Sequence, residues 1–188
     1  MELQGLIFDC DGTLADTMPL HWQAWQILLR KYGLIFPKDR FYEWGGIPSR
    51  DILRQLSREQ NVDLDALEGA REKEQAYLPL IPQARTIQPT LQVVREHHGR
   101  IPLAVASGGS RKAVGTLLIH LGIRHYFDAV VTNEDVQRQK PAPDIFLEAA
   151  CRIGVDPRFC RAYEDTETGL KAIRAAGMQA VDVRTLTA

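Results

Sequence analysis

The stretch Leu6-Ile7-Phe8-Asp9-Cys10-Asp11-Gly12-Thr13 decides the fold and much of the chemistry of this chain. Its apolar start is typical of the end of a buried strand, and two carboxylates follow only two residues apart. On an extended backbone they would lie on the same side, about 7 Å apart along the chain. Like charges this close repel unless a cation lies between them or one carboxyl keeps its proton. We therefore expect Asp9 and Asp11 to mark a site at a strand end, where α/β folds bind ligands.

The composition is that of an ordinary globular protein. The 188 residues are 45% hydrophobic and 25% charged, with a formal net charge of −1. This balance predicts no nucleic-acid or membrane partner, and no apolar run approaches the ~18 residues that span a bilayer. The first residues lack the pattern of a signal peptide, and three cysteines without zinc-like spacing argue against a disulfide framework. We expect a monomer in the cytoplasm.

Short apolar strands alternate with amphipathic helices in the second half of the chain. The predicted strands are residues 103–106, 129–132, 161–164 and 180–183, and the predicted helices are residues 111–121, 144–153 and 166–176. Ser110 and Asp144 stand where helix N-caps are expected. This alternation predicts an α/β fold with a parallel sheet flanked by helices on both faces.

Residues 16–82 contain no convincing strand pattern. Helical patterns cover residues 19–32, 49–59 and 64–78, and prolines then cluster at positions 79, 82 and 89, as in a linker. We therefore predict an inserted all-helical cap over residues 16–82. Residues 1–15 and 83–188 would form the catalytic core.

Four predicted strand ends carry polar residue types that suit phosphoryl transfer. They are Asp9 with Asp11, Ser107 with Gly108 and Gly109, Lys140, and Glu164 with Asp165. A carboxylate can attack phosphorus, and a second one can exchange a proton with the leaving oxygen and with water. Carboxylates also suit Mg²⁺, whereas a hydroxyl, backbone N–H groups and an ammonium suit phosphate oxygens. We therefore expect Asp9 to be the nucleophile, Asp11 the acid and base, and Ser107 to Gly109 with Lys140 the phosphate site.

Four motifs in order resemble those of the haloacid dehalogenase-like hydrolases. They are Asp9-Cys10-Asp11-Gly12-Thr13, Ala106-Ser107-Gly108, Lys140-Pro141, and Glu164-Asp165-Thr166 with Gly169. The resemblance covers nearly the whole chain and implies a Rossmann-like core with a helical cap. It also implies Mg²⁺ as the cofactor, held by Asp9, the backbone carbonyl of Asp11 and Asp165. Glu164 would either contact the metal or orient the neighbouring aspartate.

Within this family, the stretch from Asp16 to Trp25 resembles the first cap helix of the β-phosphoglucomutase branch. The mutase has a lysine at the position of Gly45 and a phosphate-binding arginine at the position of Ser49. Because a mutase must hold a second phosphate, these two differences weaken that alternative. The segment from Gly45 to Ser49 is more similar to bacterial fructose-1-phosphate phosphatases of the same branch.

Five cap residues are candidates for contacts with the substrate. They are His21, Trp25, Gly46, Arg50 and Lys73. A core position for Trp25 and solvated positions for Arg50 and Lys73 are the alternatives. We expect a Mg²⁺-dependent phosphatase of small sugar phosphates, with fructose 1-phosphate favoured. A β-phosphoglucomutase and a non-catalytic module that binds a sugar phosphate remain the alternative functions.

Overall fold

A five-stranded parallel sheet forms the centre of the protein. The computed structural model describes residues 2–186. The strand order is β5-β4-β1-β6-β7, which is the order of a Rossmann-like sheet. The strands are β1 (Gly5–Phe8), β4 (Leu103–Ala106), β5 (Ala129–Val131), β6 (Cys160–Glu164) and β7 (Gln179–Asp182). After β1, the chain adds β4 and β5 on one side of β1 and then β6 and β7 on the other. The carboxyl end of β1 is therefore the point where the topology switches.

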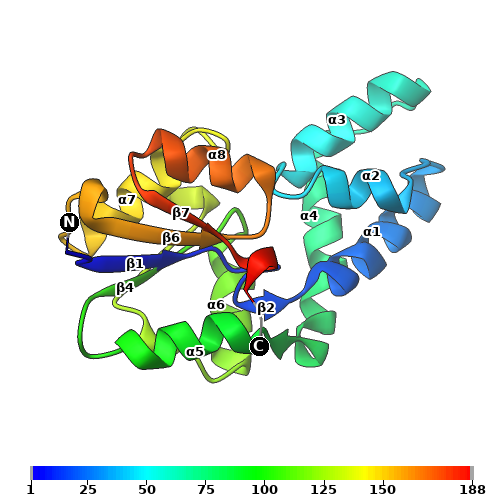
Figure 1. Cartoon of the computed structure of the whole chain (residues 1–188). Coiled ribbons are helices and arrows are strands. Elements are labelled where there is room, and N and C mark those ends of the chain that lie inside the picture. Colours follow the sequence, from blue (N-terminus) through cyan, green and yellow to red (C-terminus); the bar gives the residue numbers. More distant parts are fainter. Residues whose placement is uncertain (1, 187–188) are drawn as a thin grey trace.

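Helices cover both faces of this sheet, as predicted (Figure 1). Alternate β1 side chains point to opposite faces, so Leu6 and Phe8 join one hydrophobic cluster and Ile7 joins the other. The first cluster includes side chains of α5 (Gln88–His97) and α6 (Arg111–His120). The second includes side chains of α7 (Asp144–Arg152) and α8 (Glu167–Ala175). Because β1 is buried on both faces, its strand end is held rigidly.

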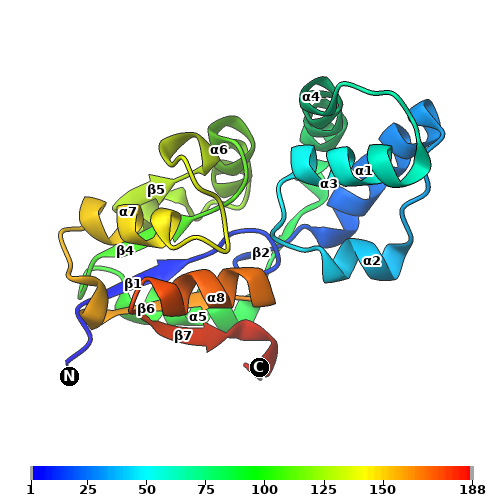
Figure 2. The same ribbon diagram turned by 90° about the horizontal axis from the view of Figure 1, so that it is seen from above.

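Four further helices form a separate group beside the carboxyl end of the sheet (Figure 2). They are α1 (Met18–Tyr32), α2 (Lys38–Glu43), α3 (Ser49–Gln60) and α4 (Ala66–Tyr77). Their own hydrophobic cluster centres on Trp25, Phe36 and Phe41. A helical insertion is thus present, and its proposed limits at residues 16 and 82 stay a prediction.

The two connections of the insertion pair with each other. Strand β2 (Ala15–Asp16) leads into it, and β3 (Arg85–Thr86) follows the 3-10 helix η1 (Leu78–Gln83) that leads out. The strands are antiparallel, with Ala15 opposite Thr86 and Asp16 opposite Arg85. The sequence pattern did not predict this pair or α2. Both are too short to show a clear hydrophobic period.

Smaller elements complete the fold, and one predicted cap is wrong. The remaining 3-10 helices are η2 (Arg124–Tyr126), η3 (Asn133–Asp135), η4 (Pro157–Phe159) and η5 (Val183–Thr185). Ser110 caps α6 as predicted, because its hydroxyl accepts a hydrogen bond from the Ala113 N–H at 3.1 Å. Asp144 instead begins α7, and its Oδ1 accepts a hydrogen bond from Arg138.

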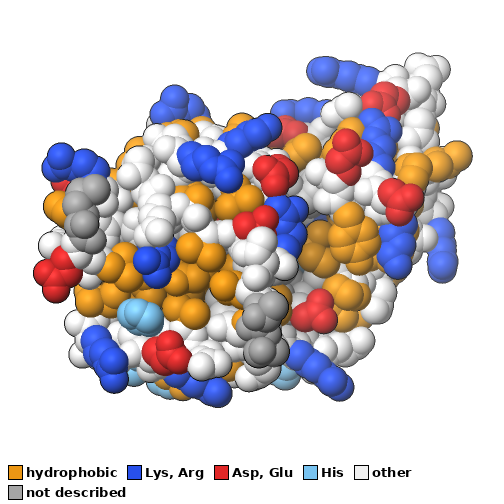
Figure 3. Space-filling model, in the orientation of Figure 1, with side chains coloured by type: hydrophobic (Ala, Val, Ile, Leu, Met, Phe, Trp, Pro, Cys, Tyr) orange, Lys and Arg blue, Asp and Glu red, His pale blue; other side chains and the backbone are white. Residues whose placement is uncertain are grey.

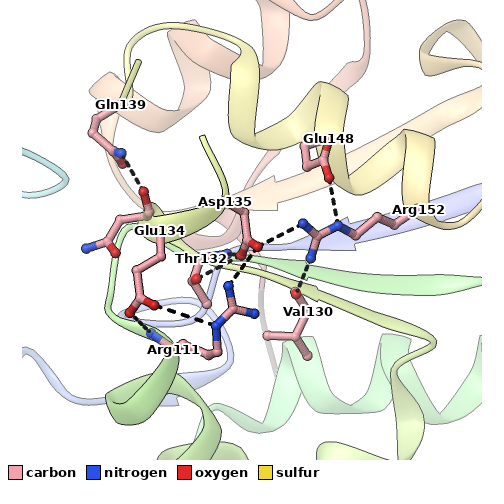
Figure 4. A network of polar contacts seen from close by, with 9 residues as sticks. Arg111, Val130, Thr132, Glu134, Asp135, Gln139, Glu148 and Arg152 are labelled. Atoms are coloured by element: carbon pink, nitrogen blue, oxygen red, sulfur yellow. Dashed lines mark hydrogen bonds and ion pairs between the residues drawn. The ribbon is translucent and has the colours of Figure 1, made fainter. Parts of the chain in front are cut away.

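An ion-pair network fixes the loop after β5 (Figure 4). Asp135 is nearly buried and accepts hydrogen bonds from Arg111 and Arg152 at 2.9 and 2.8 Å. Its other oxygen accepts bonds from the backbone N–H and hydroxyl of Thr132. Arg152 also donates to the carbonyl of Val130 on the outer strand. The network anchors the segment that leads toward Lys140.

The surface carries charges of both signs. Figure 3 shows Lys and Arg side chains mixed with Asp and Glu over the face in view, which agrees with the net charge of −1. Among residues 2–186, no helix has the length and apolar character needed to cross a membrane.

Candidate active site

The carboxyl ends of three adjacent strands bring the predicted site residues together. Asp9 follows β1, Ser107 follows β4, and Asp165 follows β6. Strand β1 pairs with both neighbours in parallel, so the three ends share one edge of the sheet. The backbone N–H of Asp9 donates to the carbonyl of Tyr163 at 3.0 Å, which extends the sheet pairing to the site itself.

A buried lysine joins two of the carboxylates. The Lys140 Nζ lies 2.6 Å from Asp9 Oδ1 and 2.7 Å from Glu164 Oε2. All three side chains are at most 8% exposed. Burial and the negative charge of Glu164 raise the pKa of Asp9 well above its usual value. Burial disfavours the Lys140 ammonium, but the charges of Asp9 and Glu164 outweigh burial and raise the pKa of Lys140. Lys140 therefore remains charged beside Asp9.

Asp165 contacts the end of the first motif, at Gly12 and Thr13. Its Oδ1 accepts a hydrogen bond from the Thr13 hydroxyl at 3.1 Å. Burial, together with the charge of Glu164, raises the pKa of Asp165 to about 7. Gly12 has a φ of +84°, and a Cβ there would lie 2.2 Å from Asp165 Oδ2. Only glycine gives both this backbone conformation and this close approach.

Three of these carboxylates form a candidate metal site. Asp9, Glu164 and Asp165 each offer an oxygen within 4.8 Å of the others. Burial and the neighbouring negative charge of Glu164 raise the pKa values of Asp9 and Asp165, and a divalent cation would favour their ionised forms. Both Glu164 oxygens already have partners, since Oε2 binds Lys140 and Oε1 accepts bonds from the N–H and hydroxyl of Thr166. The chemistry of the cluster therefore suits an oxygen-binding cation. Asp9 and Asp165 are its better candidate ligands, because each has one carboxylate oxygen without a hydrogen bond from a side chain.

Asp11 faces the helical insertion. Its Oδ1 accepts a hydrogen bond from the Thr17 hydroxyl at 2.7 Å and lies 3.0 Å from His21 Nε2. The other ring nitrogen of His21, Nδ1, lies 2.7 Å from the Lys73 Nζ. Because an ammonium can only donate, Nδ1 is the acceptor, and Nε2 must carry the proton that His21 donates to Asp11. A directed chain thus runs from Lys73 through His21 to Asp11.

The charges along this chain are consistent with that direction. Burial and the positive charge of Lys73 lower the pKa of His21, which favours the neutral ring. Burial lowers the pKa of Lys73 to about 8. Burial alone would favour a neutral Asp11, but His21, which is protonated at the acid pH where Asp11 titrates, lowers the pKa of Asp11 to about 2 by its charge and its hydrogen bond, and the Thr17 hydrogen bond adds to this. Asp11 is therefore ionised in the resting protein.

The loop after β4 lies beside Asp11. Ser107 is buried, and its Oγ accepts a hydrogen bond from the Gly109 N–H at 3.1 Å. A Cβ built on Gly109 would lie 3.8 Å from Asp11 Oδ2, whereas one on Gly108 would meet open space. The second oxygen of Asp11 thus faces the predicted phosphate loop, while its first oxygen binds the insertion.

The remaining cap candidates occupy different environments. Arg50 is exposed and lines a cleft of about 460 Å³ together with Lys140 and Lys171. Gly46 has a φ of +82° and lies against Thr166 of the core. Trp25 is 2% exposed and packs edge-on against Phe36. Trp25 thus takes the core position given above as the alternative to a substrate contact, because it fills the hydrophobic cluster of the insertion.

Comparison with known proteins identifies the family. The family profile described as "Haloacid dehalogenase-like hydrolase" matches residues 6–183. The chain belongs to this family. It is 44% identical to fructose-1-phosphate phosphatase YqaB of Escherichia coli over 182 residues, covering 97% of each protein. It is 30% identical to beta-phosphoglucomutase of Bacillus subtilis over 192 residues, covering 96% of this chain and 83% of the mutase.

The fold of this haloacid dehalogenase-like hydrolase agrees with a solved structure of the same branch. The crystal structure of beta-phosphoglucomutase from Clostridium difficile matches with a TM-score of 0.84 and 27% sequence identity. The match covers 96% of this chain and 84% of that chain. The predicted Rossmann-like core is thereby confirmed.

Sequence reasoning missed several residues that support the site. Thr13, Thr17 and Thr166 each donate a hydroxyl proton to a site carboxylate. All three stand inside or beside the quoted motifs, so their position was a usable signal. Tyr77 of α4 stacks on His21 although the two residues are far apart in the sequence, so no local sequence pattern predicts this contact.

Proposed function

We propose that this protein is a Mg²⁺-dependent phosphatase of small sugar phosphates, with fructose 1-phosphate as the favoured substrate. The observation that carries the proposal is the buried Asp9–Lys140 pair at the switch point of the sheet, with Asp11 and Asp165 beside it. A carboxylate held next to a cation suits attack on a dianionic phosphate, because the cation offsets the repulsion between them. The 44% identity to a fructose-1-phosphate phosphatase supports the choice of substrate.

The chemistry would proceed in two displacements. Asp9 attacks phosphorus, the bond from phosphorus to the sugar oxygen breaks, and Asp11 gives that oxygen a proton. In the second step Asp11 takes a proton from a water molecule, which attacks phosphorus and releases inorganic phosphate and the free Asp9 carboxylate. The proton that Asp11 loses in the first step is regained in the second. Asp11 Oδ2 is the oxygen we assign to this exchange, since Oδ1 is bound by Thr17 and His21.

Asp11 needs its proton only when the substrate is present. Its resting pKa of about 2 keeps it ionised in the free protein. A dianionic phosphate beside the carboxylate would raise this pKa, because like charges favour the protonated form. Solvent supplies the proton as the phosphate binds, and Oδ2 carries it, because Oδ1 keeps its hydrogen bonds from Thr17 and from the neutral Nε2–H of His21.

Mg²⁺ would be held by Asp9, Asp165 and the backbone carbonyl of Asp11, where it would withdraw negative charge from the phosphoryl oxygens. We assign to Glu164 the task of holding Lys140 and Thr166 in place, because both of its oxygens already have these partners. Ser107, Gly108 and Gly109 are assigned to the remaining phosphate oxygens. Lys73, with Gly46 and Arg50 at the edge of the insertion, is assigned to the sugar. His21 is assigned to the sugar only through Asp11, because its two ring nitrogens already face Asp11 and Lys73.

A phosphate-release assay tests the proposal. Purified protein with Mg²⁺ should release phosphate from fructose 1-phosphate faster than from other hexose monophosphates. Asp9→Asn should remove this activity, whereas Asp63→Asn, a matched change at an exposed position, should leave it unchanged. Release from other sugar phosphates only would refute the favoured substrate. Full activity in Asp9→Asn would refute the nucleophile.

The same preparation separates the two alternative functions. The mutase is favoured by the similarity to two beta-phosphoglucomutases, and opposed by the uncharged Gly45 and Ser49. Incubation with β-glucose 1-phosphate and a bisphosphate primer should yield free phosphate faster than glucose 6-phosphate. The reverse order of rates would identify a mutase. Binding of sugar phosphates without any phosphate release would identify a non-catalytic module.

A further inference from the structure

Tyr77 links the insertion to the sheet. It is the last residue of α4, yet its ring belongs to the hydrophobic cluster of the core, with Phe8, Leu14 and Ile81. The side chain is only 2% exposed. Its position is therefore fixed by the core rather than by the surface of the insertion.

The ring of Tyr77 forms a flat support for His21. The two rings are nearly parallel, at 15°, with their centroids 3.9 Å apart. Lys73, one helical turn before Tyr77, places its Nζ 5.4 Å from the centre of the phenol ring and 2.7 Å from His21 Nδ1. The phenol thus contacts both members of the chain that leads to Asp11. A stacked ring resists rotation of the imidazole out of its plane.

The hydroxyl of Tyr77 contributes no bond to this arrangement. It is buried and has no hydrogen-bond partner within residues 2–186. Burial, assisted by the charge of Asp11, raises the pKa of Tyr77, so the phenol stays neutral. The contact that remains is the face of the ring. The Thr17 hydroxyl lies near the phenol without forming a hydrogen bond of good geometry, so replacing tyrosine by phenylalanine removes the hydroxyl and keeps the ring to be tested.

We propose that Tyr77 is a positioning residue for the acid–base group, whose ring holds His21 with Nε2 directed at Asp11. His21 and Thr17 then fix one oxygen of Asp11 and leave Oδ2 directed at the phosphate loop. The proposal deepens the proposed function and rests on it, because the position of Asp11 matters only if Asp11 exchanges a proton with the leaving oxygen.

Leaving-group dependence is the readout that a purely structural role would not change. A sugar alkoxide needs a proton to leave, whereas p-nitrophenolate leaves without one. Tyr77→Met fills similar space without a flat face and should lower kcat/KM for fructose 1-phosphate by about tenfold or more. It should lower kcat/KM for p-nitrophenyl phosphate by less than about threefold. Tyr77→Phe should stay within about twofold of the wild type on both substrates. Tyr77→Leu serves as a second ringless variant if the methionine variant is unstable.

Three other outcomes would overturn the proposal. Equal losses on both substrates in the ringless variants would show a general packing role. Unchanged activity would show no role, and a selective loss in Tyr77→Phe would assign the effect to the hydroxyl instead of the ring.

A measurement without substrate keeps this proposal separate from the proposed function. Nitrogen-15 NMR of the imidazole, assigned with His21→Asn, reports which ring nitrogen carries the proton. The wild type and Tyr77→Phe should show the Nε2–H form, and Tyr77→Met should show a mixture of forms. If this pattern holds while the wild type hydrolyses no sugar phosphate, the proposed function fails and the positioning of His21 stands. An identical His21 signal in all variants would refute the positioning.

Discussion

Replacing Lys140 by methionine tests the buried charge cluster in a quantitative way. Lys140 holds Asp9 and Glu164 at 2.6 and 2.7 Å, and the three side chains are 4%, 8% and 2% exposed. Methionine has a volume similar to that of lysine, so the variant leaves little cavity, but it leaves two buried carboxylates without their cation. Removing one partner of such a buried pair costs about 3–5 kcal/mol. For a chain of this size, that loss lowers the midpoint of thermal unfolding by about 6–20 °C.

The loss should depend on pH with a definite sign. Burial and the charge of Glu164 already raise the pKa of Asp9 above its unfolded value, and removal of Lys140 raises it further. The folded variant then binds a proton at a pH where the unfolded chain has already lost it. Stability of Lys140→Met relative to the wild type should therefore increase as the pH falls, because protonation removes the stranded charge. The difference between variant and wild type should be smaller at about pH 5.5 than at about pH 7.5.

Urea denaturation, followed by circular dichroism in the presence of EDTA, measures these free energies of unfolding. Lys112→Met changes an exposed lysine on α6 and should stay within about 0.5 kcal/mol of the wild type. A cost below about 1 kcal/mol for Lys140→Met at neutral pH would refute the reasoning. A cost that stays constant or grows as the pH falls would refute it as well.

Three further experiments test other parts of the structure. Gly169→Ala should lower the free energy of unfolding by about 1–3 kcal/mol, because a Cβ there would lie 2.1 Å from the buried carboxyl of Glu164. Gly115→Ala, at a helical position with open space, should raise it by about 0.5–1 kcal/mol. Urea denaturation of both variants measures the two changes. Asp135→Asn should cost about 1–3 kcal/mol at neutral pH by the same assay, because the carboxylate between the two arginines of Figure 4 loses its charge. Burial opposes the shift, but hydrogen bonds from these arginines hold the pKa of Asp135 below its unfolded value. The wild type should therefore lose this contribution as the pH falls below about 4, and an equal cost at all pH values would contradict the assignment. Lys73→Met should raise the pKa of His21, because burial remains but the repelling charge is gone, and an NMR titration that finds no increase would contradict the proposed chain.

Much of the core could be predicted because its signals are local. Residues 103–106 and 129–131 are short apolar runs bounded by polar residues, and the structure makes both of them strands. The grouping of Asp9, Ser107 and Asp165 followed from one rule, since the ends of adjacent parallel strands meet at one edge. Ser110 was identifiable as a cap because the helical period begins directly after it.

The parts that could not be predicted depend on tertiary contacts. Lys73 and His21 are 52 positions apart, so no spacing rule pairs them. A tryptophan on a helix face is more often part of a core than of a binding site, and the packing of Trp25 against Phe36 is what shows the core position here. Helix α2 has six residues and one buried side chain, Phe41, which is too little for a hydrophobic period to emerge.

The central claim is that Asp9 attacks phosphorus, and direct detection of its phosphorylated form tests that claim most closely. Wild-type protein would be mixed with fructose 1-phosphate and Mg²⁺, stopped with acid within a single turnover, and treated with borohydride, which reduces an acyl phosphate to the alcohol. Peptide mass spectrometry should then find homoserine in place of aspartate at position 9, and only when the substrate was present. Substrate-dependent homoserine at position 11 instead, or phosphate release with no modified carboxylate, would contradict the account.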